Sequence, residues 1–123
     1  MTRNGNCALS VAVGIATAAL LGQAQTPKSG KDLFESRCAG CHALDRDKEG
    51  PRLAGVYGRA AGSVAGFQYS GALSKSKLTW NEETLDKWLA DPDKLVPDND
   101  MGFHVENPEE RRSIVQFLKT AAK

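Results

Sequence analysis

The chain has 123 residues, which is enough for one domain, and it carries 16 Lys and Arg against 15 Asp and Glu. A formal net charge of +1 argues against a nucleic-acid-binding protein, which would normally show a clear basic excess.

The first segment reads as an export signal. A short polar stretch with one arginine precedes an apolar run from Cys7 to Leu21, and Gly22 and Ala24 are the small residues of a cleavage site. This predicts a secretory signal peptide over 1–24 and a mature domain over 25–123, which would be formally neutral. The run is shorter than the roughly 20 residues of a membrane span. An uncleaved anchor is the alternative.

A helix is predicted over "GKDLFESRCAGCH", residues 30–42. Leu33, Phe34 and Arg37/Cys38 follow one another at three- to four-residue spacing, which gives the helix one apolar face. Ser29 is the predicted N-cap. On such a helix Cys38, Cys41 and His42 would leave one face within about one turn.

Three kinds of site compete for Cys38, Cys41 and His42, and a chance match to the motif is the fourth alternative. Their spacing and order fit c-type haem attachment, in which two thiols bond the haem and the imidazole reaches the iron. A thioredoxin-like couple would need a βαβ pattern, which the sequence lacks. A structural zinc site needs four ligands, and outside this cluster His104 is the other strong nitrogen donor.

A glycine-rich loop is predicted from Asp45 to Gly66, because the apolar residues there do not recur at helical spacing. A short helix is predicted over 70–77. A better one follows over 81–91, with Asn81 as its cap and Pro92 as its end. Its buried face is expected to hold Leu85, Trp88 and Leu89.

Residues 94–106 are predicted to be loop. Met101 lies in this loop between Asp100 and Gly102, not on an apolar stripe, which weakens the interpretation of Met101 as core filler. A thioether there is a candidate sixth ligand for an iron held by His42, and such a ligand raises the reduction potential.

The last helix has the strongest predicted start. Asn107 is the cap, Pro108 stands at the first helical position, and Glu110 would complete a capping box. No segment alternates convincingly enough to predict a strand. The fold class is therefore all-α with long loops.

Taken together, the chain resembles the class I cytochromes c, of the bacterial c2/c-550 type and similar to the mitochondrial protein. The resemblance covers nearly all of the mature chain. It is carried by "GKDLFESRCAGCH", "GPRLAGVYGR", "GFQY", "LTWNEETLDKWLADP", the loop from Pro97 to Met101 and "ERRSIVQFLK". It implies about four to five helices with Ω-loops wrapped around one haem c, held covalently by Cys38 and Cys41.

The resemblance also implies roles for single residues. His42 and Met101 would be the axial ligands, and the carbonyl of Pro51 would accept the Nδ1 proton of His42. The residues implied to hold a buried haem propionate are Arg59, Tyr69 and Trp80. Gly30 and Phe34 would lie where the first helix crosses the last, against Ile114 and Phe117.

The sequence departs from the family pattern near Met101. Leu73 and Trp88 stand where relatives often carry asparagine and tyrosine, and Asp93 and Asp100 replace lysines that ring the haem edge in mitochondrial relatives. The segment from His42 to Pro51 is also short.

The function implied by the resemblance is a soluble periplasmic one-electron carrier, not an enzyme, in an electron-transport or respiratory chain. Implied partners are redox proteins, such as a cytochrome bc1-type donor, an oxidase, a reductase or a dehydrogenase. No nucleic acid, no stable membrane insertion after cleavage and a monomer are expected. The rivals are a peroxidase-like haem domain, for which His104 is the one spare histidine, and a thiol or zinc protein.

Overall fold

A computed structural model describes residues 26–121, and the predicted signal peptide lies outside this range. The described part is helical. Its sheet-like pairing is limited to one isolated bridge, between Ala60 and Thr79. The helices are α1 (Gly30–Arg37), α2 (Gly71–Lys75), α3 (Glu82–Ala90), α4 (Pro92–Leu95) and α5 (Pro108–Thr120). The all-α prediction is confirmed.

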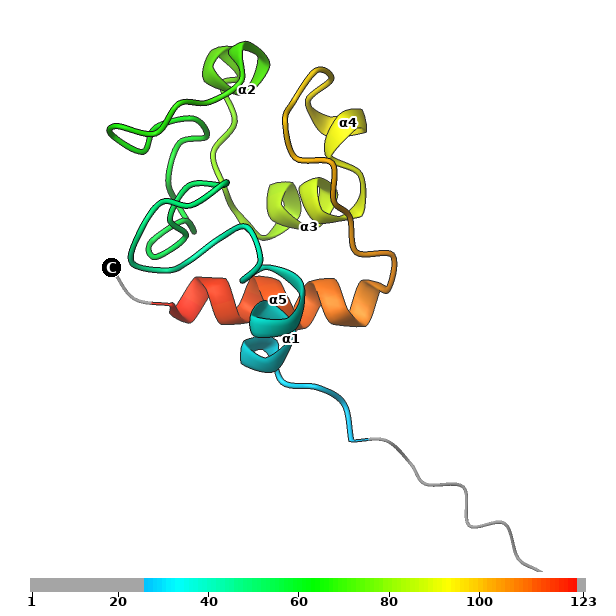
Figure 1. The fold of residues 1–123 in the computed structure, drawn as a ribbon. Helices are drawn as coiled ribbons and strands as arrows, with labels where there is room; N and C mark the ends of the chain where they lie inside the picture. Colours follow the sequence, from blue (N-terminus) through cyan, green and yellow to red (C-terminus); the bar gives the residue numbers. More distant parts are fainter. Residues whose placement is uncertain (1–25, 122–123) are drawn as a thin grey trace, which may run out of the picture.

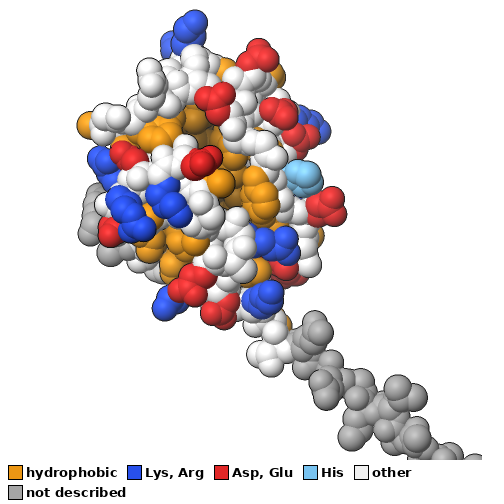
Figure 2. Space-filling view, in the orientation of Figure 1, with side chains coloured by type: hydrophobic (Ala, Val, Ile, Leu, Met, Phe, Trp, Pro, Cys, Tyr) orange, Lys and Arg blue, Asp and Glu red, His pale blue; other side chains and the backbone are white. Residues whose placement is uncertain are grey.

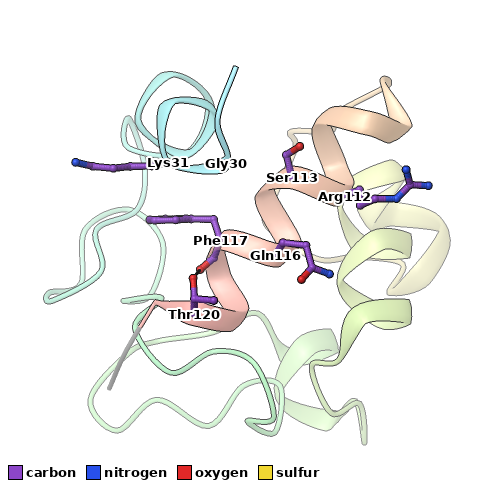
Figure 3. Close-up of a pocket in the computed structure, with 7 residues that line it drawn as sticks. All are labelled: Gly30, Lys31, Arg112, Ser113, Gln116, Phe117 and Thr120. Carbon is purple, nitrogen blue, oxygen red and sulfur yellow. Dashed lines mark hydrogen bonds between the residues drawn. The ribbon is translucent and has the colours of Figure 1, made fainter. Parts of the chain in front are cut away.

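The frame of the fold is the crossing of α1 and α5 (Figure 1). Gly30 lies so close to α5 that an added Cβ would meet the carbonyl oxygen of Ser113 and would lie 2.8 Å from the Cβ of Phe117. Figure 3 shows these residues along a surface groove between the two helices. Phe34 packs on Phe117 with 5.3 Å between ring centroids. The sequence prediction had Gly30 near Ile114 and Phe117, and the structure adds Ser113 as the closest neighbour.

Helix α3 packs against α5 as the second layer of this frame. Arg111 of α5 donates to Asp86 of α3 at 2.8 Å, and also to the carbonyl oxygens of Val105 and Glu106 at 2.9 and 2.8 Å. One guanidinium therefore joins both helices to the end of the loop that contains Met101.

The helix starts follow the predicted caps. Ser29 accepts from the amide of Asp32 in a capping box, and Asn81 does the same with Thr84. Asn107 accepts from the first-turn amides of α5. Glu110 makes no capping box. Its carboxylate instead lies 2.8 Å from Arg37 and so ties α5 to the end of α1.

Two helix boundaries differ from the prediction. Helix α1 ends at Arg37 and does not continue to His42, because the amide of Ala39 donates to the carbonyl of Phe34, five residues back, and so leaves the helical i→i−4 ladder. Pro92 ends α3 as predicted, but it also begins α4 in a segment partly predicted as loop. A proline lacks the N–H that α3 would need, yet it suits the first position of a new helix. Asp91 supplies the cap of α4.

Most of the buried residues come from α1, α3 and α5 and from the loop segments around Val56, Trp80, Val96 and Val105. Among the described residues no polar side chain is fully buried. The glycine-rich stretch from 45 to 66 contains no helix, as predicted, and wraps the same core from the other side (Figure 1).

Candidate functional site

A cavity of about 340 Å³ opens on one face of the domain, where Figure 2 shows a hollow lined by hydrophobic side chains. Its walls include all eight residues that the sequence singled out. They are Cys38, Cys41, His42, Pro51, Arg59, Tyr69, Trp80 and Met101. The structure therefore brings together side chains from widely separated parts of the chain.

The turn after α1 presents the Cys-x-x-Cys-His group to this cavity. Although the helix has ended, the amides of Cys41 and His42 both donate to the carbonyl of Cys38, at 3.1 and 2.8 Å. The second bond has the spacing of a helical turn, so Cys38 and His42 keep nearly the relation that the helix prediction assumed. No disulfide joins the two cysteines.

The His42 ring is fixed by the segment that follows it. Its Nδ1 lies 2.8 Å from the carbonyl oxygen of Pro51, which accepts the ring proton in the Nδ1–H tautomer. Gly50 lies against the ring, since an added Cβ would contact Cε1 and lie 2.6 Å from Nδ1. Burial lowers the pKa of His42, which favours the neutral imidazole that a metal requires.

The Cys38 thiol is not activated as a nucleophile. Burial raises the pKa of Cys38 to about 11, whereas a reactive cysteine needs a thiolate. Within residues 26–121 no three His, Cys, Asp or Glu side chains are placed to hold a metal ion together. This arrangement does not support the four-ligand site that a structural zinc ion needs.

A cation on the cavity wall has no acidic partner. Arg59 donates to the carbonyl oxygens of Arg52 and Ala54, at 3.0 and 3.3 Å, and no carboxylate of the described residues pairs with it. Burial lowers the pKa of Arg59 below its ordinary value. The guanidinium has five N–H donors, so some remain for a bound anion.

Tyr69 and Trp80 extend this polar corner. The Tyr69 hydroxyl accepts from the amide of Val64 at 3.1 Å, which leaves its own proton free to be donated. Trp80 is buried and packs on Trp88 with 5.3 Å between ring centroids. A partly desolvated cation beside a free hydroxyl suits a carboxylate of a bound group.

Met101 is held at both ends. Its sulfur accepts from the indole N–H of Trp88 at 3.0 Å, and its backbone amide donates to the side-chain oxygen of Asn99 at 2.7 Å. Trp88 thus supplies an N–H donor where relatives often carry tyrosine. Leu73, at the other departure from the family pattern, lines the cavity and offers no polar atom from its side chain.

These residues fit a haem. The cavity is largely apolar, it carries two thiols beside an imidazole, and it places a methionine sulfur on the same walls. The unpaired guanidinium of Arg59 matches the carboxylate that such a group would bury.

Sequence reasoning missed Asn99, and it did not connect Gly50 with the ring of His42. An Asn two residues before Met101 is the pattern of an Asx-turn, so a local signal for Asn99 was present. His104 is not among the residues that line the cavity. Its side chain is 56% exposed and lies 3.6 Å from Glu106.

Comparison with known proteins gives one consistent result. The family described as Cytochrome c matches residues 27–122. The chain is 46% identical over 86 residues to cytochrome c2 iso-2 of Magnetospirillum molischianum, covering 68% of this chain and 89% of the relative. It is 41% identical to cytochrome c of Chlamydomonas reinhardtii, with 75% and 86% covered. Cytochrome cH from Methylobacterium extorquens superposes with a TM-score of 0.71 at 41% identity, covering 74% of this chain and 94% of that one.

Proposed function

The chain belongs to the cytochrome c family, and from that premise we propose that it is an exported one-electron carrier with His42 and Met101 as its axial ligands. It is an electron-transfer protein, not an enzyme, and it binds one c-type haem covalently through Cys38 and Cys41. The haem iron supplies the one-electron couple when it is bound.

One observation carries the axial-ligand proposal. His42 follows α1 and Met101 follows α4, yet both line the one cavity that also holds the two cysteines. Neither side chain is needed there as apolar filler, because five leucines, two tryptophans, Val56 and Ile114 already line the walls.

The ring of His42 is prepared for a metal by its neighbours. Pro51 takes the Nδ1 proton, so the lone pair of the neutral ring is left on Nε2. This contact fixes both the tautomer and the orientation of the ring, and it raises ligand basicity.

The sulfur of Met101 is prepared in a similar way. Trp88 donates to one lone pair of the thioether, and the second lone pair remains free for a metal. An indole N–H can donate but not accept, so it imposes one orientation on the sulfur. A neutral sulfur ligand in an apolar cavity favours the reduced state and a high potential.

Electron exchange would occur at the mouth of the cavity. Phe103, 38% exposed, lines that mouth two residues after Met101. With both axial positions filled by protein side chains, no position would remain for a substrate, in line with a carrier.

Export and location are the second part of the proposal. We base them on the signal-like residues 1–24, since haem of this type is attached outside the cytoplasm in the family that the chain resembles. Among the described helices none is long and apolar enough to span a bilayer. The proposal is a monomer in the periplasm of a bacterium, cut after Ala24, that meets a bc1-type donor and an oxidase, reductase or dehydrogenase.

The axial ligands are tested with Met101→Ala. The native ferric protein is expected to be low-spin, with a weak sulfur–iron band in the far red. The variant should keep its covalent haem, lose that band, show a lower potential and bind carbon monoxide when reduced. An unchanged spectrum in the variant would remove Met101 from the iron.

The control for this test is His104, three residues away. If His104 captures the iron in Met101→Ala, a bis-histidine spectrum appears and should vanish in Met101→Ala/His104→Ala. His104→Ala alone should leave the native spectrum as it is, because His104 does not line the cavity.

A further inference from the structure

Asn99 uses its whole side-chain amide to hold the loop that contains Met101. Its Oδ1 accepts from the Met101 amide at 2.7 Å. Its Nδ2 donates to Oδ1 of Asp93 and to the carbonyl oxygen of Val96, both at 2.9 Å. Both N–H groups and the oxygen are therefore occupied.

This arrangement fixes which way the amide faces. One end meets a donor and the other meets two acceptors, so a flipped amide would lose all three hydrogen bonds. Both acceptors belong to one helix, because Asp93 lies within α4 and Val96 is the C-cap residue of α4. Asn99 thus connects the backbone at Met101 to a helix that packs against α3.

The contact at the other end of Met101 is independent of this one. Trp88 of α3 reaches the sulfur, while Asn99 reaches the backbone nitrogen. The backbone between Asn99 and Met101 passes through exposed Asp100 and has no other hydrogen bond within the described residues. Loss of the Asn99 contact would leave the sulfur contact as the sole polar restraint on this residue.

We propose that Asn99, anchored by Asp93, is a positioning residue that keeps Met101 directed into the cavity. The proposal rests on the proposed function, because it assumes that Met101 is an axial ligand. Asn99 touches neither haem nor substrate in this role. It lowers the fraction of time in which the loop is open and the iron is accessible to another ligand.

Asn99→Asp is the sharpest variant. It keeps an oxygen for the Met101 amide, but it replaces the Nδ2 donor with an oxygen that faces the carboxylate of Asp93 and the carbonyl of Val96. Two hydrogen bonds become repulsive contacts. The affinity of the ferric protein for added imidazole, which competes with the native sixth ligand, should rise by roughly tenfold or more.

The double variant Asn99→Asp/Asp93→Asn provides the rescue. Exchanging the two groups restores one donor–acceptor pair between the side chains, so imidazole affinity should return to within about threefold of native. Asp93→Asn alone keeps an acceptor oxygen and should change the affinity less than about twofold. Asp98→Asn is the matched control for Asp93→Asn. It also removes one negative charge next to this contact, but Asp98 makes no hydrogen bond to Asn99.

The readouts separate positioning from general stability. Thermal unfolding is measured in parallel, and a residue with a merely structural role would lower the melting temperature without changing imidazole affinity at 25 °C. If Asn99→Asp is not recovered folded, Asn99→Ala takes its place, with an expected rise of about threefold. Native affinity in the folded single variant, or no recovery in the double variant, would overturn the proposal.

The spectrum of the native protein distinguishes this failure from failure of the proposed function. If the native protein lacks the sulfur–iron band, Met101 is not the ligand and the proposal falls with that assignment. If the band is present and the Asn99 variants match the native affinity, only the positioning role fails.

Discussion

His42 is confined by the two residues that close the loop after it. The amide of Gly50 donates to the carbonyl of Cys41 at 2.8 Å, which brings the backbone at Gly50 against the imidazole. The carbonyl of Pro51 then reaches Nδ1. A glycine is needed here for close approach, since any Cβ would overlap the ring.

Gly50→Ala is therefore expected to displace the His42 ring. The added methyl would lie 2.6 Å from Nδ1, and the ring cannot yield without stretching its bond to Pro51. Overpacking of this kind costs about 1–3 kcal/mol. We expect a melting temperature lower by roughly 4–8 °C for each kcal/mol, measured by thermal unfolding of the holoprotein.

The control for this variant is Gly40→Ala, between the two cysteines. A Cβ at Gly40 meets nothing within 4 Å, so the change should stay within about 0.5 kcal/mol. Equal melting temperatures for the two variants would contradict a tight contact between Gly50 and the ring.

At the scale of single residues, the sequence identified the chemically important side chains better than it identified their contacts. Cys38, Cys41 and His42 form a motif with fixed spacing, and Met101 stands out because a lone methionine in a polar loop is unusual. Asn99 shows only the local pattern of an Asx-turn, which does not reveal its other partners. Its role depends on α4 placing Asp93 within 2.9 Å, and α4 itself was not predicted.

At the scale of helices, the crossing of α1 and α5 depends on a glycine at its closest point. Gly30 is the first residue of α1, and it faces the Ser113 carbonyl across the interface. This contact lets Phe34 reach Phe117. The sequence indicated this pairing through family resemblance, since the amphipathic pattern of each helix gives its buried face but not its partner.

Gly30→Ala should push α1 away from α5. The new methyl would lie 2.8 Å from Phe117 Cβ and 3.0 Å from the Ser113 carbonyl carbon, both of which are held by a long helix. We expect a loss of about 1–3 kcal/mol in the free energy of unfolding, measured by denaturant titration of the holoprotein.

Gly71→Ala is the matched control, because Gly71 is also the first residue of a helix and a Cβ there meets nothing within 4 Å. The better helix propensity of alanine should make this variant neutral or slightly more stable. A loss equal to that of Gly30→Ala would show that the loss is not specific to the crossing of α1 and α5.

Helix starts were predicted more accurately than helix ends. Capping residues such as Ser29, Asn81 and Asn107 act locally, and the sequence shows them directly. The end of α1 comes instead where the amides of Cys38 and Ala39 both donate to the carbonyl of Phe34. Glu110 turns away from its expected cap toward Arg37 of another helix. Tertiary partners of this kind leave no pattern in the local sequence.

Across the whole molecule, the core and the cavity share the same side chains. Trp80, Leu85, Ile114 and Leu118 are buried core residues that also line the cavity. A domain of this size has a thin apolar core, so a group bound in the cavity would supply much of the missing contact area. The haem site is thus also the centre of the folded domain.

The face around the cavity carries mixed charge. In Figure 2 acidic side chains gather over α4 and the loop that follows it, and basic side chains lie on the opposite side of the hollow. At the mouth, Asp100 and Glu49 are exposed, while the basic Arg37 is already paired with Glu110. A partner or probe that approaches from the Met101 side therefore meets negative charge first.

Asp100→Lys should reverse this local field, and small charged probes can measure it without knowledge of the physiological partner. Oxidation of the reduced native protein by ferricyanide, an anion, should change little or rise as salt is added, because salt screens repulsion. In the variant the rate at low ionic strength should rise by about two- to tenfold and then fall with salt. Hexaammineruthenium(II), a cation that reduces the ferric protein, should show the opposite trends.

Glu35→Lys makes the same change in net charge on α1, away from the cavity, and should have a much smaller effect. Asp93 is left unchanged in this charge experiment because it anchors Asn99. A native rate with ferricyanide that falls steeply with salt, measured by stopped flow, would mean that a positive face dominates the approach to the cavity.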